Sequence, residues 1–275
     1  MDGRHGPDVR LYALTVLWLV TVLWLAISAG CAPVVPHTLP DRPALLAAVT
    51  WNMDAGRGDL ARLVADLERG RLGIQSPGAY LLLLQESATG EFEDIARPRH
   101  WATCFAPVRA TGGQVRGNAI VFSRSLRNCR VVPLPRERQS RAAAVASIDL
   151  AGQELFAAST HLENRVAWWK GGLFSDSARQ HQVEALLHAI PQRAPGILGG
   201  DFNTWLGPNE AAWRILVERF HNTREWSGPP TFADRLVLDH LFMDLPDGWR
   251  MARWVVRDNY GSDHQPVIAV IFGPA

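Results

Sequence analysis

Short apolar runs recur along the chain from residue 45 onward, separated by polar stretches that contain glycine, proline or charged residues. Runs of this length are typical of buried β-strands. They predict strands over residues 45–52, 80–84, 101–106, 118–122, 130–134, 142–148, 155–159, 236–243, 254–257 and 267–272. A further strand is expected to end just after the apolar pair Ile197-Leu198.

Apolar residues at intervals of three and four predict helices between these strands. One begins near Asp59, whose carboxylate can cap a helix, and stops at Gly70. Two more are expected over residues 177–190 and 209–220. Many short strands with few inserted helices predict an α/β fold of two packed mixed β-sheets flanked by helices.

The amino-terminal segment follows a different pattern. Residues 11–30 are nearly all apolar, close to the ~20 residues that a helix needs to cross a bilayer. Arg4 and Arg10 precede this run, which favours a cytoplasmic amino terminus and export of the rest. The run ends in Ser28-Ala29-Gly30-Cys31, which resembles a bacterial lipoprotein cleavage site, although Ser28 stands where leucine or valine is usual.

Three outcomes stay open for residues 1–31: lipidation at Cys31, an uncleaved signal anchor, or a cleaved secretory peptide. The first two hold the protein on the outer side of a bacterial cytoplasmic membrane, and the third releases it into the periplasm or the medium. Prolines spaced through residues 32–44 predict an extended linker. One globular domain is then expected over residues 45–275.

The composition is ordinary for a globular protein, with 47% hydrophobic and 20% charged residues. Roughly 230–240 residues remain after the amino-terminal segment, enough for one large core. The formal net charge is +1, which excludes a strongly basic nucleic-acid footprint but not a local arginine patch.

Two cysteines of the globular domain, Cys104 and Cys129, can be interpreted in two ways. In an oxidising compartment they can pair, and closing that loop could add roughly 3 to 4 kcal/mol to the free energy of unfolding. Alternatively, both are buried free thiols.

Polar side chains stand where the predicted strands end. The stretch Gly199-Gly200-Asp201-Phe202-Asn203 combines a carboxylate, which can hold water or metal, with an amide that can contact phosphate without repelling it. Alone this stretch is also good turn chemistry. The other acids, amides and histidines at strand ends are Asn52, Glu86, His161, Asp239, Asp263 and His264. They can converge only if the two sheets bring these edges together.

With these residues, the chain resembles the endonuclease/exonuclease/phosphatase superfamily, which has the DNase-I-like fold. The matching motifs, in the order usual for the family, are Thr50-Trp51-Asn52, Gln85-Glu86, Gly117-Asn118-Ala119, Thr160-His161-Leu162, Gly200-Asp201-Phe202-Asn203, Asp239-His240-Leu241-Phe242 and Ser262-Asp263-His264. The resemblance implies a four-layer sandwich of two mixed sheets flanked by helices over residues 45–275, in an exported or membrane-anchored bacterial member.

The resemblance also implies a role for each matching residue. Glu86 would bind a divalent cation, Mg²⁺ or Mn²⁺, supported by Asn52 and Asp263. Asp201 would orient or deprotonate the attacking water, while Asn203 and Asn118 bind the phosphate. The remaining catalytic side chains are His264 paired with Asp239, and His161 near the phosphorus or the leaving oxygen.

The other histidines are interpreted as structural. His240 follows Asp239 in a predicted strand, so its side chain should point to the opposite face of the sheet. His181, His188 and His221 lie on or beside predicted helices.

The function predicted from these residues is a metal-dependent phosphoesterase, most simply a phosphodiesterase, that acts as a monomer. The substrate is left open between nucleic acid, a phospholipid head group and inositol phosphates. The tether and the apolar segment that contains Trp168 and Trp169 favour a lipid, whereas the family favours nucleic acid. The alternative is a non-catalytic binding module that retains the DNase-I-like fold.

Overall fold

The computed structural model describes residues 42–111, 113–164, 175–221 and 228–274. The chain divides into two units, residues 1–34 and 35–275. The predicted anchor and nearly all of the predicted linker lie outside the described residues, as does the segment with Trp168 and Trp169. Within the described ranges, no helix is both long and apolar enough to span a membrane.

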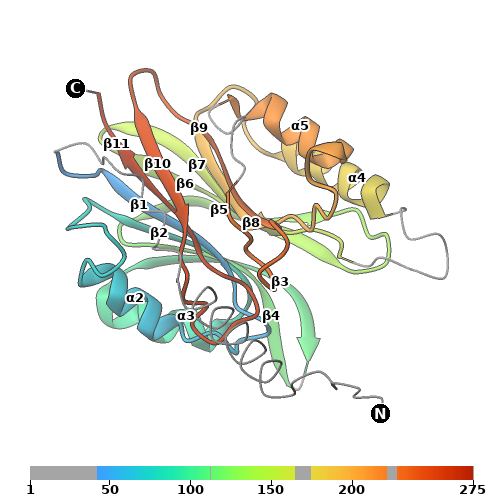
Figure 1. Ribbon diagram of the computed structural model, residues 1–275, viewed down its shortest axis with the longest axis horizontal. Coiled ribbons are helices and arrows are strands. Elements are labelled where there is room, and N and C mark those ends of the chain that lie inside the picture. Colours follow the sequence, from blue (N-terminus) through green and yellow to red (C-terminus); the bar gives the residue numbers. More distant parts are fainter. Residues whose placement is uncertain (1–41, 112, 165–174, 222–227, 275) are drawn as a thin grey trace, which may run out of the picture. The chain divides into compact units, whose positions relative to one another are not determined.

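The first β-sheet has six strands (Figure 1). In spatial order they are β10 (Arg250–Val255), β11 (Val267–Phe272), β1 (Leu46–Asn52), β2 (Tyr80–Ala88), β4 (Gln114–Phe122) and β3 (Ala102–Thr111). β1 runs parallel to β2, and the other neighbours are antiparallel. The sheet is therefore mixed, as the sequence predicts.

The second sheet has five strands. In spatial order they are β5 (Leu126–Leu134), β6 (Arg141–Leu150), β7 (Gln153–His161), β8 (Gly196–Asp201) and β9 (Asp239–Asp244). Here the parallel pair is β7 and β8. Each sheet thus holds one parallel pair whose carboxyl ends lie at one edge.

Helices cover the outer faces of both sheets (Figure 1). α2 (Leu60–Glu68) and α3 (Thr89–Ala96) lie on the six-stranded sheet, and α4 (Ser175–Ala189) and α5 (Ala211–Arg219) on the five-stranded one. Short 3₁₀ turns, η1 (Arg97–Arg99) and η3 (Gly207–Asn209), follow α3 and precede α5. The four-layer α/β sandwich predicted from the sequence is confirmed.

Alternation along the strands divides the buried apolar side chains into three layers. In β1, Leu46 and Ala48 point into the core between the sheets, whereas Val49 and Trp51 point into the core beneath α2. A third core lies between the five-stranded sheet and α4 and α5. This alternation with a period of two residues is what lets one strand serve two cores.

One helix was not predicted. α3 begins directly after β2 and has only eight residues, among them Gly90, so it shows little helical periodicity. Its start is set locally, because the Glu91 carboxylate accepts a hydrogen bond from the Ala88 backbone N–H (2.8 Å). Several strands are also longer than the apolar runs that predicted them, because backbone hydrogen bonds continue into the neighbouring polar residues.

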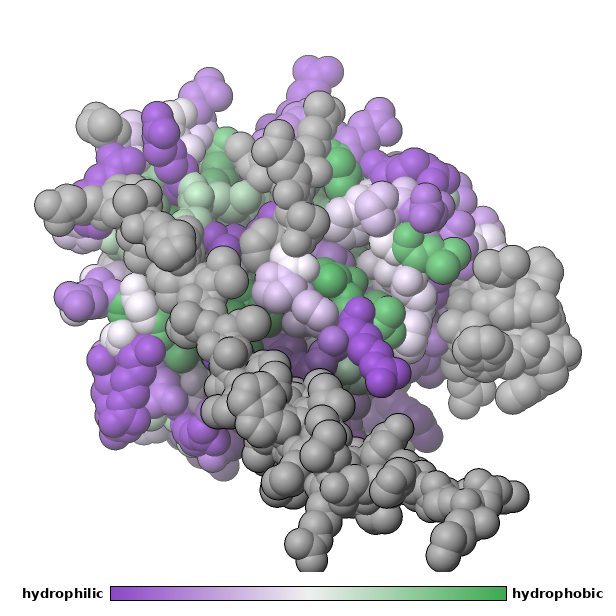
Figure 2. Space-filling model, in the orientation of Figure 1, coloured by the Kyte–Doolittle hydropathy of each residue, from purple (hydrophilic) through white to green (hydrophobic). Residues whose placement is uncertain are grey.

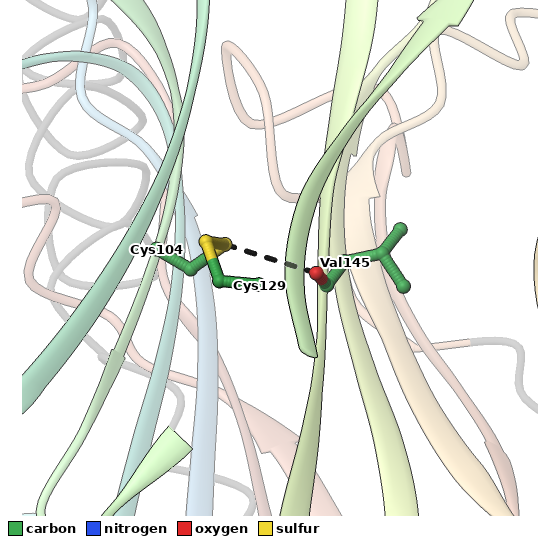
Figure 3. The surroundings of a disulfide bond; sticks show 3 residues. All are labelled: Cys104, Cys129 and Val145. Atoms are coloured by element: carbon green, nitrogen blue, oxygen red, sulfur yellow. Dashed lines mark hydrogen bonds between the residues drawn. A yellow bond between two sulfur atoms is a disulfide. The ribbon is translucent and has the colours of Figure 1, made fainter. Parts of the chain in front are cut away.

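A disulfide joins the edges of the two sheets. Cys104 on β3 and Cys129 on β5 are bonded, with their Cα atoms 5.6 Å apart, so the disulfide alternative holds and the free thiols do not (Figure 3). The carbonyl oxygen of Val145 lies 3.7 Å from the Cys104 sulfur. At the opposite edge, Arg253 of β10 donates to the carbonyl of Leu241 on β9 (2.5 Å). At each end of the sandwich, an edge strand of one sheet is therefore linked to an edge strand of the other.

The surface of the described part is largely polar. On the face shown in Figure 2, hydrophilic side chains predominate outside the grey residues, and apolar ones emerge in small separate areas. The large hydrophobic residues exposed in the described ranges are Val115, Val131 and Leu206.

We expect the double substitution of Cys104 and Cys129 by serine to lower the free energy of unfolding by about 3 kcal/mol, because the bond closes a loop with a sequence separation of 25. Urea denaturation of the variant, compared with wild-type protein with and without reductant, checks this. Equal stability of the oxidised wild type and the variant would contradict it.

Candidate active site at the strand ends

Hydrogen bonds between the sheets bring the strand ends together. Asn52 at the end of β1 donates from Nδ2 to Oδ2 of Asp201 at the end of β8 (3.0 Å). One layer below, the buried amide of Gln85 donates to Ser159 Oγ (3.1 Å), and Ser159 in turn donates to the Leu84 carbonyl (2.9 Å). These contacts fix the carboxyl ends of β1 and β2 against those of β7 and β8.

The two glycines before Asp201 allow this approach. Both lie inside β8 and not in a turn, which corrects the turn interpretation of the stretch. A Cβ atom on Gly199 would lie 2.6 Å from Leu83 Cδ1 and 2.9 Å from Thr50 Cβ, both on the opposite sheet. A Cβ on Gly200 would lie 2.2 Å from the Thr160 carbonyl oxygen. The glycines are therefore required by packing between strands and between sheets.

Glu86 and Asn203 project from residues in the left-handed backbone region, with φ values of 55° and 51°. Glu86 sits where the β2–β4 register shifts, and a bulge of this kind turns a side chain away from its regular direction. Its Oε2 accepts from the Ala55 N–H (3.0 Å), and its side chain remains 34% exposed. This conformation is unfavourable for glutamate by roughly 1 kcal/mol or more.

His161 lies between two carboxylates. Its Nε2 is 3.3 Å from Asp201 Oδ2, and its Nδ1 is 3.6 Å from Glu86 Oε1. Burial, with the nearby charges of Arg141 and His264, lowers the pKa of His161 well below its usual value. The ring is therefore neutral near pH 7.

Asp239 and His264 form the tightest pair of the site. His264 Nδ1 lies 2.7 Å from Asp239 Oδ2, and the Phe232 ring packs against the imidazole with centroids 4.7 Å apart. Burial lowers the pKa of His264, but the carboxylates of Asp239 and Asp201 outweigh it and raise that pKa to about 10. His264 is thus an imidazolium at neutral pH.

Asp201 occupies the centre of the group. Its oxygens accept from Asn52 and from the Asn203 backbone N–H (3.0 Å), and His264 Nε2 lies 3.8 Å away. Burial raises the pKa of Asp201 to about 7, although the His264 charge and these hydrogen bonds work in the opposite direction. A carboxyl group with this pKa can gain or lose a proton at physiological pH.

The remaining predicted residues lie around this centre. Asp263 Oδ1 is 3.8 Å from His264 Nε2, and its side chain is 52% exposed. Asn203 donates to the Leu162 carbonyl (3.3 Å). Asn118 is buried and donates to the Ala142 carbonyl (2.6 Å), so its amide links β4 to β6. Its role in phosphate binding stays a prediction.

Comparison with known proteins identifies the group to which this site belongs. The model of the endonuclease/exonuclease/phosphatase family matches residues 49–264. The chain belongs to this family. Members of the superfamily are phosphoester hydrolases. A search of the curated proteins finds no match.

Several solved structures share the fold of this chain. An endonuclease/exonuclease/phosphatase from Beutenbergia cavernae has 19% identity and a TM-score of 0.61, covering 84% of this chain and 72% of its own. The catalytic domain of human Nocturnin has 17% identity and a TM-score of 0.61, with 84% and 99% covered. The mannosyl-6-phosphatase Bt3783 of Bacteroides thetaiotaomicron has 14% identity and a TM-score of 0.58, with 82% and 99% covered.

One residue of the site, Arg141, was not predicted from the sequence. Arg141 at the start of β6 is half-buried, and its Nε is buried with no hydrogen-bond partner among the described residues. Burial lowers the pKa of Arg141, whereas the charges of Asp201, Glu163 and Glu86 raise it. A signal was available, because in a hairpin of strands 142–148 and 155–159 the residue before the first strand lies beside the end of the second, near His161.

His240 has the structural role predicted from alternation. It is buried against Trp213, with ring centroids 4.6 Å apart, and near Phe202 and Phe242. Burial, followed by the Arg253 charge, lowers the pKa of His240 to about 3. The exposed His181 pairs with Glu137 on the surface.

The donor set of the site fits a hard divalent cation. Asp201, Asp239 and His264 each offer a ligand atom, all within 4.8 Å of one another, so this group could hold an ion when the His264 ring is deprotonated. The Asp239 Oδ1 atom is buried without a hydrogen-bond partner among the described residues. Glu86, the predicted ligand, offers a partly exposed carboxylate on the other side of His161. Carboxylate and amide oxygens of this kind suit Mg²⁺.

We expect Asp239→Asn to remove the charge that raises the pKa of His264. In the wild type the folded state holds this proton up to pH ~10 and the unfolded state up to only ~6.5, so the pair stabilises the fold below pH 6.5 and this stabilisation is lost as the pH rises toward 10. The stability difference between wild type and variant should therefore shrink by at least about 1 kcal/mol between pH 6.5 and 9.5. Urea denaturation at both pH values checks this, and a constant difference would contradict the assignment.

Proposed function

We propose that this family member is a divalent-metal-dependent phosphodiesterase that cleaves a P–O bond by in-line attack of water. The observation that carries the proposal is the convergence of Asp201, His161 and the Asp239–His264 pair on one point, with Glu86 beside it. This arrangement offers a proton acceptor, a cationic donor and a cation ligand within a few ångströms, as phosphoryl transfer requires.

Asp201 is the proposed general base. Its pKa of about 7 keeps a substantial fraction ionised at neutral pH while leaving it basic enough to accept a proton from water. Hydrogen bonds from Asn52 and the Asn203 backbone fix the direction of the carboxylate. Water held on Asp201 would be oriented without a further conformational change.

His264 is the proposed electrostatic partner. Because Asp239 keeps it protonated, it serves as a donor to a phosphoryl oxygen and not as the base. The neutral His161 is proposed to donate to the leaving oxygen or to stabilise the phosphorus centre. Arg141, a half-buried cation that forms no ion pair with any described carboxylate, is proposed to bind the negative charge of the scissile phosphate.

Glu86 would hold the metal, with Asn52 and Asp263 as supporting oxygens. Its carboxylate is accessible, whereas the ring nitrogens of protonated His264 are donors and cannot coordinate an ion in that state. When bound, Mg²⁺ would supply Lewis-acid polarisation of a phosphoryl oxygen and neutralise developing charge.

The proposed location is the outer side of a bacterial cytoplasmic membrane, with residues 1–31 as anchor or signal and residues 32–44 as tether. The apolar run over residues 11–30 supports this proposal. So does the Cys104–Cys129 bond, since disulfides persist in oxidising compartments.

We expect Asp201→Ala and His264→Ala each to reduce turnover of bis-p-nitrophenyl phosphate by about 10²-fold or more in the presence of Mg²⁺, since each removes a proton-transfer or charge-stabilising group. His181→Ala, on the exposed surface, is the control and should retain wild-type turnover. Near-normal rates in either site variant would remove that residue from the mechanism. A wild-type protein without turnover would favour the binding module.

Glu86→Gln should raise the Mg²⁺ concentration needed for half-maximal activity by about tenfold or more, because a neutral amide binds Mg²⁺ more weakly than a carboxylate. Glu93→Gln removes the same charge from an exposed position on α3 and should leave the requirement unchanged. Titration of activity with Mg²⁺ distinguishes the two. An identical requirement in both variants would exclude Glu86 as a ligand.

A further inference from the structure

Two segments with unfavourable backbone angles direct the side chain of Glu86. Glu86 itself lies in the left-handed region at the bulge of β2. The turn Asp54-Ala55-Gly56 has φ values of 46°, 54° and 80°, and its Ala55 N–H donates to Glu86 Oε2 (3.0 Å). Residues other than glycine rarely adopt such angles unless the surrounding contacts impose them. The bulge and the turn therefore need support from their neighbours.

An ion pair between β4 and α3 supports the bulge. Arg116 of β4 donates from Nη1 to Glu91 Oε1 on α3 (3.0 Å) and to the backbone carbonyl of Glu86 (3.4 Å). Its Nη2 donates to Gln114 Oε1 (2.8 Å), so the guanidinium is held in place on both sides. Glu91 in turn accepts from the Ala88 N–H through Oε2 (2.8 Å). The pair is thus fixed to the backbone on both sides of the bulge.

The same ion pair supports the turn. A Cβ atom on Gly56 would lie 1.9 Å from Glu91 Oε1 and 2.3 Å from Arg116 Nη1. The turn therefore lies directly against the pair, with no room for a side chain between them. One ion pair contacts both the backbone of Glu86 and the turn that holds its carboxylate.

We propose that Arg116 and Glu91 are positioning residues for the cation site, because they fix the direction of the Glu86 carboxylate. This inference rests on the proposed function, in which Glu86 binds the metal. Neither Arg116 nor Glu91 is a ligand, and the pair is neutral as a whole, so its effect on cation binding comes from geometry and not from net charge. Without the pair, the bulge and the turn can relax toward ordinary backbone angles, and the carboxylate loses its fixed direction.

The test uses full-length protein in a neutral detergent, stripped of metal with EDTA, and compares R116Q/E91Q with E93Q/R97Q. Each double variant removes one positive and one negative charge, so the net charge stays constant. The control removes an exposed ion pair at the same helix, with Arg97 and Glu93 3.3 Å apart. Glutamine at position 91 can still accept from the Ala88 N–H, so the start of α3 is kept.

Binding of Mn²⁺, which takes the same carboxylate ligands as Mg²⁺, is measured by electron paramagnetic resonance of the free ion. R116Q/E91Q should bind Mn²⁺ about tenfold more weakly than the wild type, whereas E93Q/R97Q should bind it equally well. In an E86Q background, R116Q/E91Q should cause no further loss, since the pair acts through Glu86. Urea denaturation checks that every variant is folded.

Equal Mn²⁺ affinity of R116Q/E91Q and the wild type, with weaker binding by E86Q, would overturn the proposal. So would a loss that persists in full in the E86Q background, because the pair would then act through the fold at large. An E86Q variant that binds Mn²⁺ like the wild type would overturn the proposal together with the ligand role of Glu86. Failure of the proposed function is a different result, namely no turnover of bis-p-nitrophenyl phosphate by the wild type with Mg²⁺, and the Mn²⁺ affinities remain readable in that case.

Discussion

The hydrogen bond from Asn52 to Asp201 is the contact on which the site depends, because it crosses from one sheet to the other at the level of the chemistry. The two residues lie 149 positions apart, and only the packed sandwich brings them within 3.0 Å. Beneath them, Gln85 and Ser159 repeat the connection in the buried interior, where an unpaired polar group would be costly. These hydrogen bonds hold the two sheets in one relative position. The distances between the catalytic side chains are fixed as a result.

The environments of the ionisable groups in the site shift their pKa values in different directions. Burial favours a protonated Asp201 and a neutral His161, whereas the carboxylate of Asp239 favours a charged His264. His161 and His264 each lie within ion-pairing range of Asp201, at 3.3 and 3.8 Å. At neutral pH the three groups are a neutral ring, a donor cation and a carboxyl group near the midpoint of its titration. Such separation lets one pocket supply acid and base functions together, at some expense of stability.

Much of the fold could be predicted because its strands are short, apolar and bounded by polar residues. β1, α2 and β11 occur almost where periodicity places them, and the Asp59 cap is present. α3 could not be predicted, since its start depends on one carboxylate and its length is too short for a clear period.

The convergence of Asn52, Glu86, His161 and Asp201 followed from their place at strand ends. Their distances did not, because these depend on how closely the sheets pack. Arg141 was missed because its place near His161 follows only from pairing the two strands of the hairpin, and the residues around it in the sequence do not indicate it.

The glycine pair in β8 sets the distance between the two sheets next to the catalytic residues. Gly199 faces Leu83 and Thr50 on the other sheet with no room for a methyl group, so the separation between the layers at this point is set by a missing side chain. An alanine there would push the layers apart and draw Asp201 away from Asn52. Turnover would then fall although Gly199 does not contact the substrate. A substitution that alters packing between the sheets would lower the catalytic rate before it measurably lowers the stability of the fold.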